Sequence, residues 1–152
     1  MYQRILVPLD GSELAECALS HVKNLVRTGC AGEVVLLNVF WALTYPLVAG
    51  EPPASYIIQI IRNARNASRD YLAGVQSRLS ADGIAVKTES LEHDHPGAAI
   101  SDYAQKNGVD LIIMGTHGYT GLKKVMLGSV AIEVLHNSRV PVLLIRAESC
   151  SK

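Results

Sequence analysis

Glycines are concentrated in one segment of the chain, immediately after an apolar run. Gly115, Gly118, Gly121 and Gly128 lie close together, and Ser129 follows the last of them. Glycine lets the backbone curl until several N–H groups converge, and convergent N–H groups bind anions. The first turn of a helix adds N–H donors without intrahelical partners and a partial positive charge. The spacing therefore predicts a phosphate-binding segment that ends at a helix N-terminus, with the Ser129 hydroxyl as a further ligand.

This segment does not follow the common phosphate-binding or catalytic templates. A P-loop requires GxxxxGK followed by Ser or Thr, a dinucleotide fingerprint requires GxGxxG after the first strand, and a hydrolase elbow requires GxSxG. Here Gly115 and Gly118 give GxxG after the fourth expected strand, and Ser129 is not flanked by the elbow glycines. A phosphate site of a different kind is indicated.

The elements that must position this segment alternate between strands and helices. Apolar runs predict buried strands at residues 4–9, 33–40, 109–114 and 140–145, and an alternating pattern predicts a half-exposed strand at 84–91. Helical spacing fills the intervals, with Pro96 and Gly128 at two helix starts. This order predicts one α/β domain over residues 1–148, a doubly wound sheet of five parallel strands with helices on both faces, and a short tail at 149–152.

Ligands of such sheets bind beyond the carboxyl ends of the strands, where the strand order reverses. Pro8, Leu9 and Asp10 end the first expected strand, and Met114 and Gly115 end the fourth. The site is therefore expected between these two strand ends. The alternative for Asp10 is a helix N-cap beside Ser12.

The chain resembles the universal stress protein family, in its ATP-binding branch. The resemblance rests on the pattern Gly115-x2-Gly118-x9-Gly128-Ser129, the opening ILVPLDGS, the segment MGTHG and the closing SVAIEVLHNSRVPVLLIR. It covers the whole chain with one copy of the domain. It implies a Rossmann-like fold, similar to that of adenine nucleotide alpha hydrolase-like proteins.

The resemblance also implies roles for individual residues. Pro8, Leu9 and Asp10 would frame the adenosine of ATP, with Asp10 accepting from the ribose hydroxyls, and Val39 would pack against adenine. The residues that would line or hold the rest of the nucleotide are Met114, Gly115, His117, Gly118, Gly128, Ser129 and the N–H group of Val130. Mg²⁺ would accompany the phosphates without a protein site of its own. Tyr119 stands where many relatives have Arg, and Val130 where some have Asn.

Relatives of this kind imply a homodimer paired through the last strand, here Val140, Val142 and Leu144. The function implied is that of a cytoplasmic, nucleotide-dependent stress-response protein that acts on a regulatory protein partner. No general base is evident beside the expected phosphates, so binding with slow or no hydrolysis is expected rather than an enzyme. Two alternatives use the same residues: a nucleotide-free dimeric interaction module, and a slow ATPase or phosphotransferase.

Composition excludes several other classes. Lys and Arg total 14 and Asp and Glu total 14, so the chain lacks the basic excess of a nucleic-acid binder. No apolar run reaches the ~20 residues of a membrane span. The three widely spaced cysteines predict free thiols in a reducing cytoplasm. His93 and His95 flank Asp94, but Pro96 follows directly and no distant third ligand is evident, so a solvated loop is expected rather than a metal site.

Overall fold

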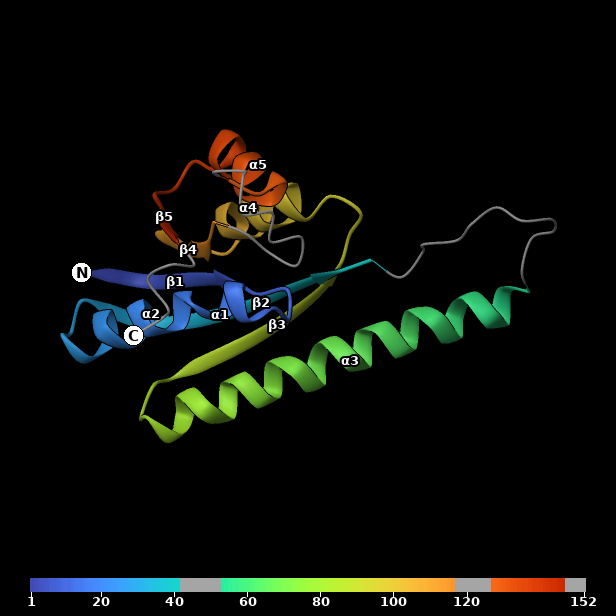
Figure 1. The fold of residues 1–152 in the computed structure, drawn as a ribbon, viewed down its shortest axis with the longest axis horizontal. Coiled ribbons are helices and arrows are strands. Elements are labelled where there is room, and N and C mark those ends of the chain that lie inside the picture. Colours follow the sequence, from blue (N-terminus) through green and yellow to red (C-terminus); the bar gives the residue numbers. More distant parts are fainter. Residues whose placement is uncertain (42–52, 117–126, 147–152) are drawn as a thin grey trace.

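The computed structural model describes residues 1–41, 53–116 and 127–146. Strands and helices alternate along these ranges (Figure 1). The strands are β1 (Tyr2–Pro8), β2 (Ala31–Phe40), β3 (Val86–Glu92), β4 (Leu111–Gly115) and β5 (Val142–Ile145). The helices are α1 (Glu13–Glu16), α2 (Ala18–Arg27), α3 (Ala54–Ala81), α4 (Pro96–Lys106) and α5 (Ser129–Asn137).

The strands form one parallel sheet in the order β3-β2-β1-β4-β5. The order reverses at β1, which pairs with β2 on one side and β4 on the other. Pro8 is in register with Leu37 of β2, and Leu6 with Ile112 of β4. The predicted doubly wound, five-stranded parallel sheet is confirmed.

The core has two halves, one on each face of the sheet. Ile5 and Val7 of β1 pack with α1, α2 and α3, whereas Leu6 between them packs with α4 and α5. Figure 1 shows the two groups of helices on opposite sides of the strands. Because both faces are covered, the central strands read as continuous apolar runs instead of alternating ones.

The element boundaries differ from expectation by one or two residues at most strand ends, and three of the differences have a physical reason. The first helix divides at Cys17 into α1 and α2, and Ser12 caps α1 by accepting from the Ala15 N–H at 3.1 Å. Strand β2 begins at Ala31 and includes Gly32, where a Cβ would lie 2.8 Å from the Gln3 carbonyl oxygen, so glycine permits the close approach of β1. Strand β5 begins only at Val142, so the prediction that Val140 belongs to the last strand is wrong; Pro141 between them has no N–H to donate.

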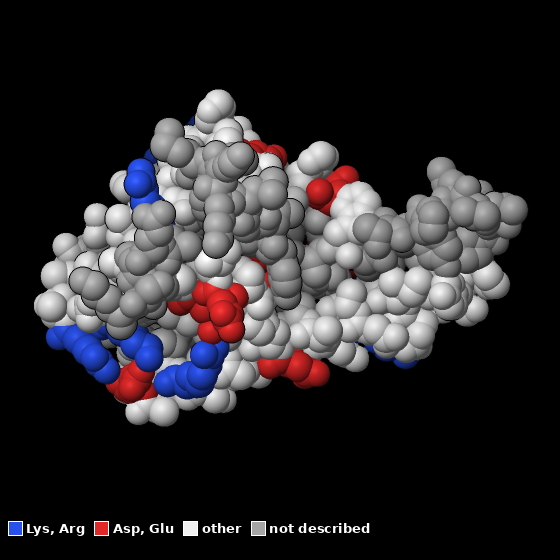
Figure 2. All heavy atoms as spheres, viewed as in Figure 1, with Lys and Arg blue, Asp and Glu red and all other residues white. Residues whose placement is uncertain are grey.

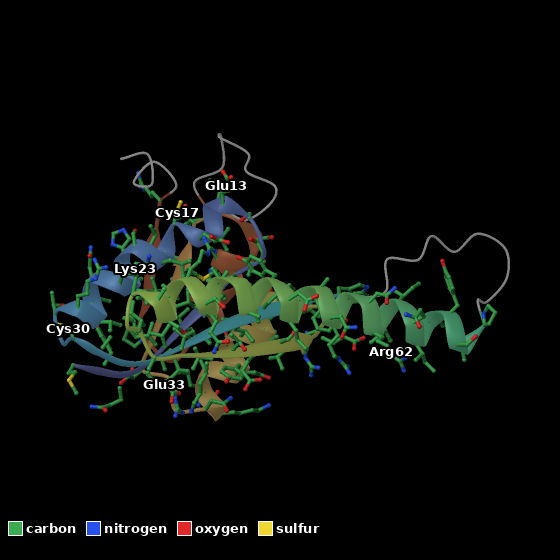
Figure 3. All side chains as sticks on the ribbon, turned by 90° about the horizontal axis from the view of Figure 1, so that it is seen from below. Glu13, Cys17, Lys23, Cys30, Glu33 and Arg62 are labelled. Atoms are coloured by element: carbon green, nitrogen blue, oxygen red, sulfur yellow. The ribbon has the colours of Figure 1, made fainter. Side chains whose placement is uncertain are left out.

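Helix α3 is longer than the sheet that it covers. Its fully buried positions start at Ser68, and the preceding turns extend past the strands (Figure 1). Arg62 lies on this projecting part (Figure 3). Among the described helices, none combines the length and the apolar character that crossing a bilayer would require.

Candidate functional site

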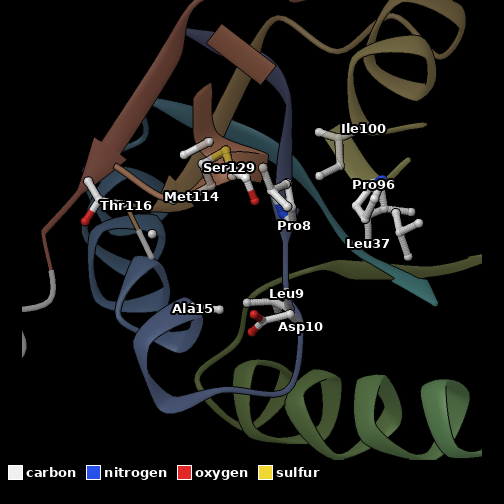
Figure 4. Close-up of a pocket in the computed structure, with 15 residues that line it drawn as sticks. Pro8, Leu9, Asp10, Ala15, Leu37, Pro96, Ile100, Met114, Thr116 and Ser129 are labelled. Carbon is white, nitrogen blue, oxygen red and sulfur yellow. The ribbon is translucent and has the colours of Figure 1, made fainter. Parts of the chain in front are cut away.

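A pocket of about 250 Å³ lies at the carboxyl ends of β1 and β4, where the strand order reverses. Figure 4 shows that its walls come from both halves of the chain. The lining residues are Pro8, Leu9, Asp10, Ala15, Leu37, Val39, Pro96, Ile100, Met114, Gly115, Thr116, Gly128, Ser129, Val130 and Ala131. This is where doubly wound sheets bind ligands.

Two hydrogen bonds at Leu9 fix the backbone where it leaves β1. The Leu9 N–H donates to the Leu37 carbonyl at 2.8 Å, and the Leu9 carbonyl accepts from Asn38 Nδ2 at 2.7 Å. Gly11 then takes φ 87°, in the left-handed region that favours glycine, and turns the chain toward α1. Asp10, between them, is exposed and lines the pocket with its carboxylate on the rim (Figure 4).

The carboxylate of Asp10 also organises this turn. Its Oδ1 accepts from the Ser12 N–H at 3.0 Å and from the Ser12 hydroxyl at 2.6 Å. Ser12, not Asp10, is the N-cap of α1. The alternative considered for Asp10, an N-cap, is therefore not realised, although the carboxylate supports the residue that caps.

The opposite wall is the start of α5. The Gly128 N–H donates to the Thr116 carbonyl at 2.7 Å, and the Thr116 N–H donates to the Ile145 carbonyl at 2.9 Å. Gly128 has an extended backbone and no side chain to cap the helix. The N–H groups of Ser129 and Val130 belong to the first turn, where a helix supplies no backbone acceptor. These donors and the Ser129 hydroxyl suit an anionic group.

Most of the remaining lining is apolar. Val39 and Leu37 come from β2, Met114 from β4 and Ile100 from α4. Met114 is only 6% exposed and Ile100 only 3%. Apolar walls with a few convergent polar groups are typical of small-molecule sites.

All the predicted site residues that the structure describes line this one pocket: Pro8, Leu9, Asp10, Val39, Met114, Gly115, Gly128, Ser129 and Val130. His117 and Gly118 lie outside the described residues, so their roles stay predictions. One detail differs, because the Gly128 N–H is engaged with Thr116 and offers the ligand no donor.

Six lining residues were not predicted from the sequence: Ala15, Leu37, Pro96, Ile100, Thr116 and Ala131. Thr116 directly follows Gly115, and Ala131 directly follows Val130, so adjacency to predicted residues was a usable signal for both. Pro96 and Ile100 had no such signal, because the sequence does not show how close α4 comes to β1.

Two acidic residues, Glu133 and Glu16, lie outside the described pocket lining and contact other elements. The Glu133 carboxylate lies against Gly97 in the first turn of α4, close enough that a Cβ on Gly97 would come within 2.5 Å of its Oε2. Glu16 accepts from the Tyr71 hydroxyl at 3.0 Å and from Arg78 at 2.7 Å. Burial of the Tyr71 ring and the neighbouring Glu16 charge raise the pKa of this phenol above its usual range.

The two histidines lie on either side of one exposed carboxylate. His93 Nδ1 lies 3.3 Å from Asp94, His95 Nε2 lies 3.8 Å from the same carboxylate, and all three side chains are exposed. Among the described residues, no group of three metal-ligating side chains converges. On the face in Figure 2, acidic and basic side chains are interspersed, as the balanced composition suggests.

The expectation of three free thiols is wrong for Cys17. This half-buried residue at the junction of α1 and α2 is disulfide-bonded. Cys30 is a free, exposed thiol at the far end of α2 (Figure 3). Wide spacing in the sequence did not exclude a bridge, because it says little about distance in the fold.

Strand order, two-sided helix packing and a pocket at the switch point define a doubly wound α/β protein with a candidate ligand pocket at the carboxyl edge of its sheet. The model of the Universal stress protein family matches residues 1–146. The chain belongs to the universal stress protein family.

Individual relatives agree with this assignment. Universal stress protein MJ0577 of Methanocaldococcus jannaschii is 33% identical over 160 residues, which cover 98% of each chain. Universal stress protein MJ0531 of the same organism is 32% identical over 146 residues, covering 96% of this chain and 83% of the relative. The solved structure of MJ0577 superposes with a TM-score of 0.83 at 35% identity and covers 96% of both chains.

Two more distant structures share the fold and contain nucleotides. A universal stress protein in complex with cAMP has a TM-score of 0.59 at 20% identity, covering 96% of this chain and 98% of the other. A universal stress protein family protein from Arabidopsis thaliana with AMP bound has a TM-score of 0.66 at 15% identity, covering 95% and 91%.

Proposed function

We propose that this chain binds ATP in the pocket between β1 and β4 and acts as a cytoplasmic regulatory protein of the stress response. One observation carries the proposal: three kinds of group converge on the same pocket. These are the apolar walls, the Asp10 carboxylate and the N–H groups of the first turn of α5. The AMP and cAMP complexes of two proteins with this fold support an adenine nucleotide as the ligand.

Each part of an adenine nucleotide has a matching group in the pocket. Val39 and Met114 would enclose the flat, apolar faces of the adenine. The Asp10 carboxylate would accept from the ribose hydroxyls. The N–H groups of Ser129 and Val130, with the Ser129 hydroxyl, would hold phosphate oxygens, and His117 and Gly118 are proposed to join them.

Mg²⁺ is proposed to bind as a complex with the nucleotide phosphates. The described part of the pocket lining has a single carboxylate, that of Asp10. Mg²⁺ commonly keeps several waters and binds through substrate phosphates instead of an all-protein cage. The donor set therefore fits a metal carried by the nucleotide.

The proposed activity is binding, with slow or no hydrolysis. Fast hydrolysis needs a group that positions and deprotonates a water beside the terminal phosphate. Glu133, the acidic residue of α5, has its carboxylate against Gly97 of α4. The proposal therefore assigns Glu133 to the contact between the two helices.

The proposed assembly is a homodimer through β5. The Pro141 carbonyl accepts from Ile112 of β4, and the Ile145 carbonyl accepts from Thr116 directly after β4. Val142 and Leu144 therefore direct their backbone groups to the other edge of the sheet, which no described strand covers. Leu143 is 39% exposed on this strand. An apolar edge strand with open backbone groups favours pairing with a second chain. A regulatory partner would then distinguish the nucleotide-bound dimer from the free one.

The test of the proposed function starts with freshly purified protein. It is denatured, and any released nucleotide is identified by mass spectrometry. Protein stripped of nucleotide is then titrated calorimetrically with ATP and Mg²⁺, and in parallel with AMP, adenosine and GTP. Released ATP, or micromolar affinity for ATP with weak binding of GTP, is the expected result.

Other outcomes decide between the alternatives. A protein that is empty and ignores ATP at millimolar concentration contradicts the proposal and supports the nucleotide-free dimeric module. Rapid release of more than one ADP per protein molecule contradicts the proposal of binding without fast hydrolysis and supports an ATPase.

A further inference from the structure

A series of hydrogen-bonded polar side chains, two of them buried, connects the rim of the pocket to α3 and β3. Asn38 is 8% exposed within the apolar strand β2, and Ser68 is 6% exposed on the inner face of α3. Ser90 of β3 lies beside Ser68. None of the three lines the pocket. Burial of polar groups is costly unless they are hydrogen-bonded, so their partners are informative.

The hydrogen bonds run in one direction, toward β1. Asn38 Nδ2 donates to the Leu9 carbonyl at 2.7 Å. The Ser68 hydroxyl donates to Asn38 Oδ1 at 2.6 Å and also contacts the Ser90 hydroxyl. Because one end of the Asn38 amide accepts from Ser68, the end that donates must face Leu9.

The Leu9 carbonyl, which these side chains hold, lies between the end of β1 and the turn that faces the pocket. The ladder bond from the Leu9 N–H to Leu37 holds the other side of the same residue. Asp10 follows directly, and after it Gly11 leaves the strand geometry with φ 87°. The Asn38 amide therefore fixes the peptide plane from which the Asp10 carboxylate is presented.

We infer that Asn38 is a positioning residue for the nucleotide site: it holds the Leu9 carbonyl and thereby the Asp10 carboxylate, while Ser68 fixes the orientation of its amide. This inference rests on the proposed function, because it concerns the ribose end of the same pocket. An apolar residue would pack in β2 as Leu36 and Leu37 do, but it would leave the Leu9 carbonyl buried without a partner, at the cost of an unmade hydrogen bond.

The test compares two variants of Asn38 with a matched pair at Ser68. Asn38→Asp keeps the shape but replaces the donor by a second acceptor facing the Leu9 carbonyl. It is expected to raise the Kd for ATP, AMP and adenosine alike by about tenfold, and Asn38→Ala by somewhat less. Ser68→Ala is expected to raise Kd about threefold, whereas Ser68→Thr, which keeps the hydroxyl, retains wild-type affinity.

A control separates positioning from general loss of stability. Ile84 is 3% exposed in the turn before β3, at the end of the sheet opposite the pocket. Ile84→Val is expected to lower the free energy of unfolding while leaving every Kd unchanged. Equal Kd increases in Ile84→Val and Ser68→Ala at the same residual stability would overturn the inference.

A second readout needs no ligand. Amide hydrogen exchange of Leu9 and Asp10 in the nucleotide-free protein is expected to accelerate at least tenfold in Asn38→Asp and Ser68→Ala relative to Ile84→Val. Unchanged exchange at these amides overturns the inference even if affinity falls. If the wild-type protein binds no nucleotide, the proposed function fails, and the exchange rates still decide whether Asn38 holds this strand end. If Asn38→Asp does not fold, the Ser68 pair gives the same decision.

Discussion

The Asp10 carboxylate both stabilises the turn that leads to α1 and lines the pocket. Its Oδ1 accepts two hydrogen bonds from Ser12, and Ser12 in turn caps α1. A loss of binding on removal of Asp10 therefore has two explanations, a missing ligand contact or a loosened turn. A variant at Ser12 separates them.

At the scale of single residues, Asp10→Ala is expected to weaken ATP and adenosine binding alike, by about tenfold or more, since hydrogen bonds to a charged group contribute ~1.5–3 kcal/mol. Ser12→Ala removes the cap but keeps the carboxylate, so it is expected to lower stability by about 1 kcal/mol with little effect on affinity. Calorimetry and chemical denaturation of both variants provide the measurements. A defect for ATP with none for adenosine would refute the ribose contact.

The same scale shows where the sequence was informative. Residues next to a strand end or a glycine motif, such as Asp10 and Ser129, were predicted and lie at the pocket. Asn38 was not singled out, because in the sequence it is one polar residue within an apolar run. Its role depends on Ser68, 30 positions away, and on the Leu9 carbonyl. Such contacts follow from the strand order and the placement of α3.

At the scale of elements, the first turn of α5 allows a backbone test. Ser129 is the first helical residue and Gly128 before it is extended, with φ −71° and ψ 157°. Proline is favoured at this position and is compatible with an extended preceding residue. Ser129→Pro is therefore expected to keep the helix while deleting both the N–H and the hydroxyl.

The expected result of Ser129→Pro is an ATP affinity reduced by about tenfold or more, with adenosine affinity unchanged. Ser129→Ala deletes the hydroxyl alone and should have the smaller effect. Titrations with ATP and adenosine measure the difference. Wild-type ATP affinity in Ser129→Pro would show that the phosphates lie elsewhere.

The contact between α4 and α5 depends on Gly97. A Cβ there would lie 2.6 Å from the Glu133 Cβ, whereas a Cβ on Gly74 of α3 would meet nothing within 4 Å. Gly97→Ala is therefore expected to lower the free energy of unfolding by about 1–3 kcal/mol through overpacking. Gly74→Ala is expected to raise it by about 0.5–1 kcal/mol through helix propensity. Urea denaturation of the pair gives both values, and equal shifts would contradict the packing argument.

Ion pairs also connect β1, β2 and β3 near their amino ends. Glu33 of β2 lies 2.8 Å from Lys87 of β3 and 2.8 Å from Arg4 of β1. The Lys87 ammonium group, and then Arg4, hold the pKa of Glu33 below its usual value of 4.5. A carboxylate whose pKa is lower in the folded state adds stability above its unfolded pKa and loses it as the pH falls through the folded value.

Glu33→Gln is accordingly expected to cost about 0.2–1 kcal/mol of unfolding free energy at pH 7, the range for exposed ion pairs. The difference from wild type should shrink below about pH 4.5 and disappear once Glu33 is protonated in the folded protein. Denaturation curves between pH 7 and pH 3 measure it. A difference that is independent of pH would show that the charges do not act as described.

The elements themselves were largely predictable, and their ends were not. All five strands and the helices between them lie where periodicity placed them, because buried parallel strands and long amphipathic helices leave strong patterns. The division of the first helix at Cys17 was missed because its apolar spacing continues across the break. The late start of β5 follows from Pro141, whose missing N–H could have been read from the sequence.

At the scale of the whole molecule, the open edge at β5 makes a prediction about assembly. Leu143→Lys places a charge on the exposed face of this strand and is expected to prevent the proposed dimer, so that the variant is a monomer. Ile58→Lys, on the projecting part of α3 at a residue that is 57% exposed, should leave the dimer intact. Light scattering coupled to size-exclusion chromatography at several concentrations measures both. A monomeric Ile58→Lys with a dimeric Leu143→Lys would move the interface to α3.

The hydrogen bond from the Gly128 N–H to the Thr116 carbonyl joins the exit of β4 directly to the entry of α5. The end of the sheet and the start of the last helix are thus joined by a hydrogen bond of their own. Closing a longer connection is inexpensive, about 0.6 kcal/mol for each doubling of its length. Insertions or replacements between these two residues should leave the frame folded, so that ligand preference can diverge among descendants while the scaffold is inherited unchanged. The same bond makes this position a suitable graft site for engineering new binding specificities.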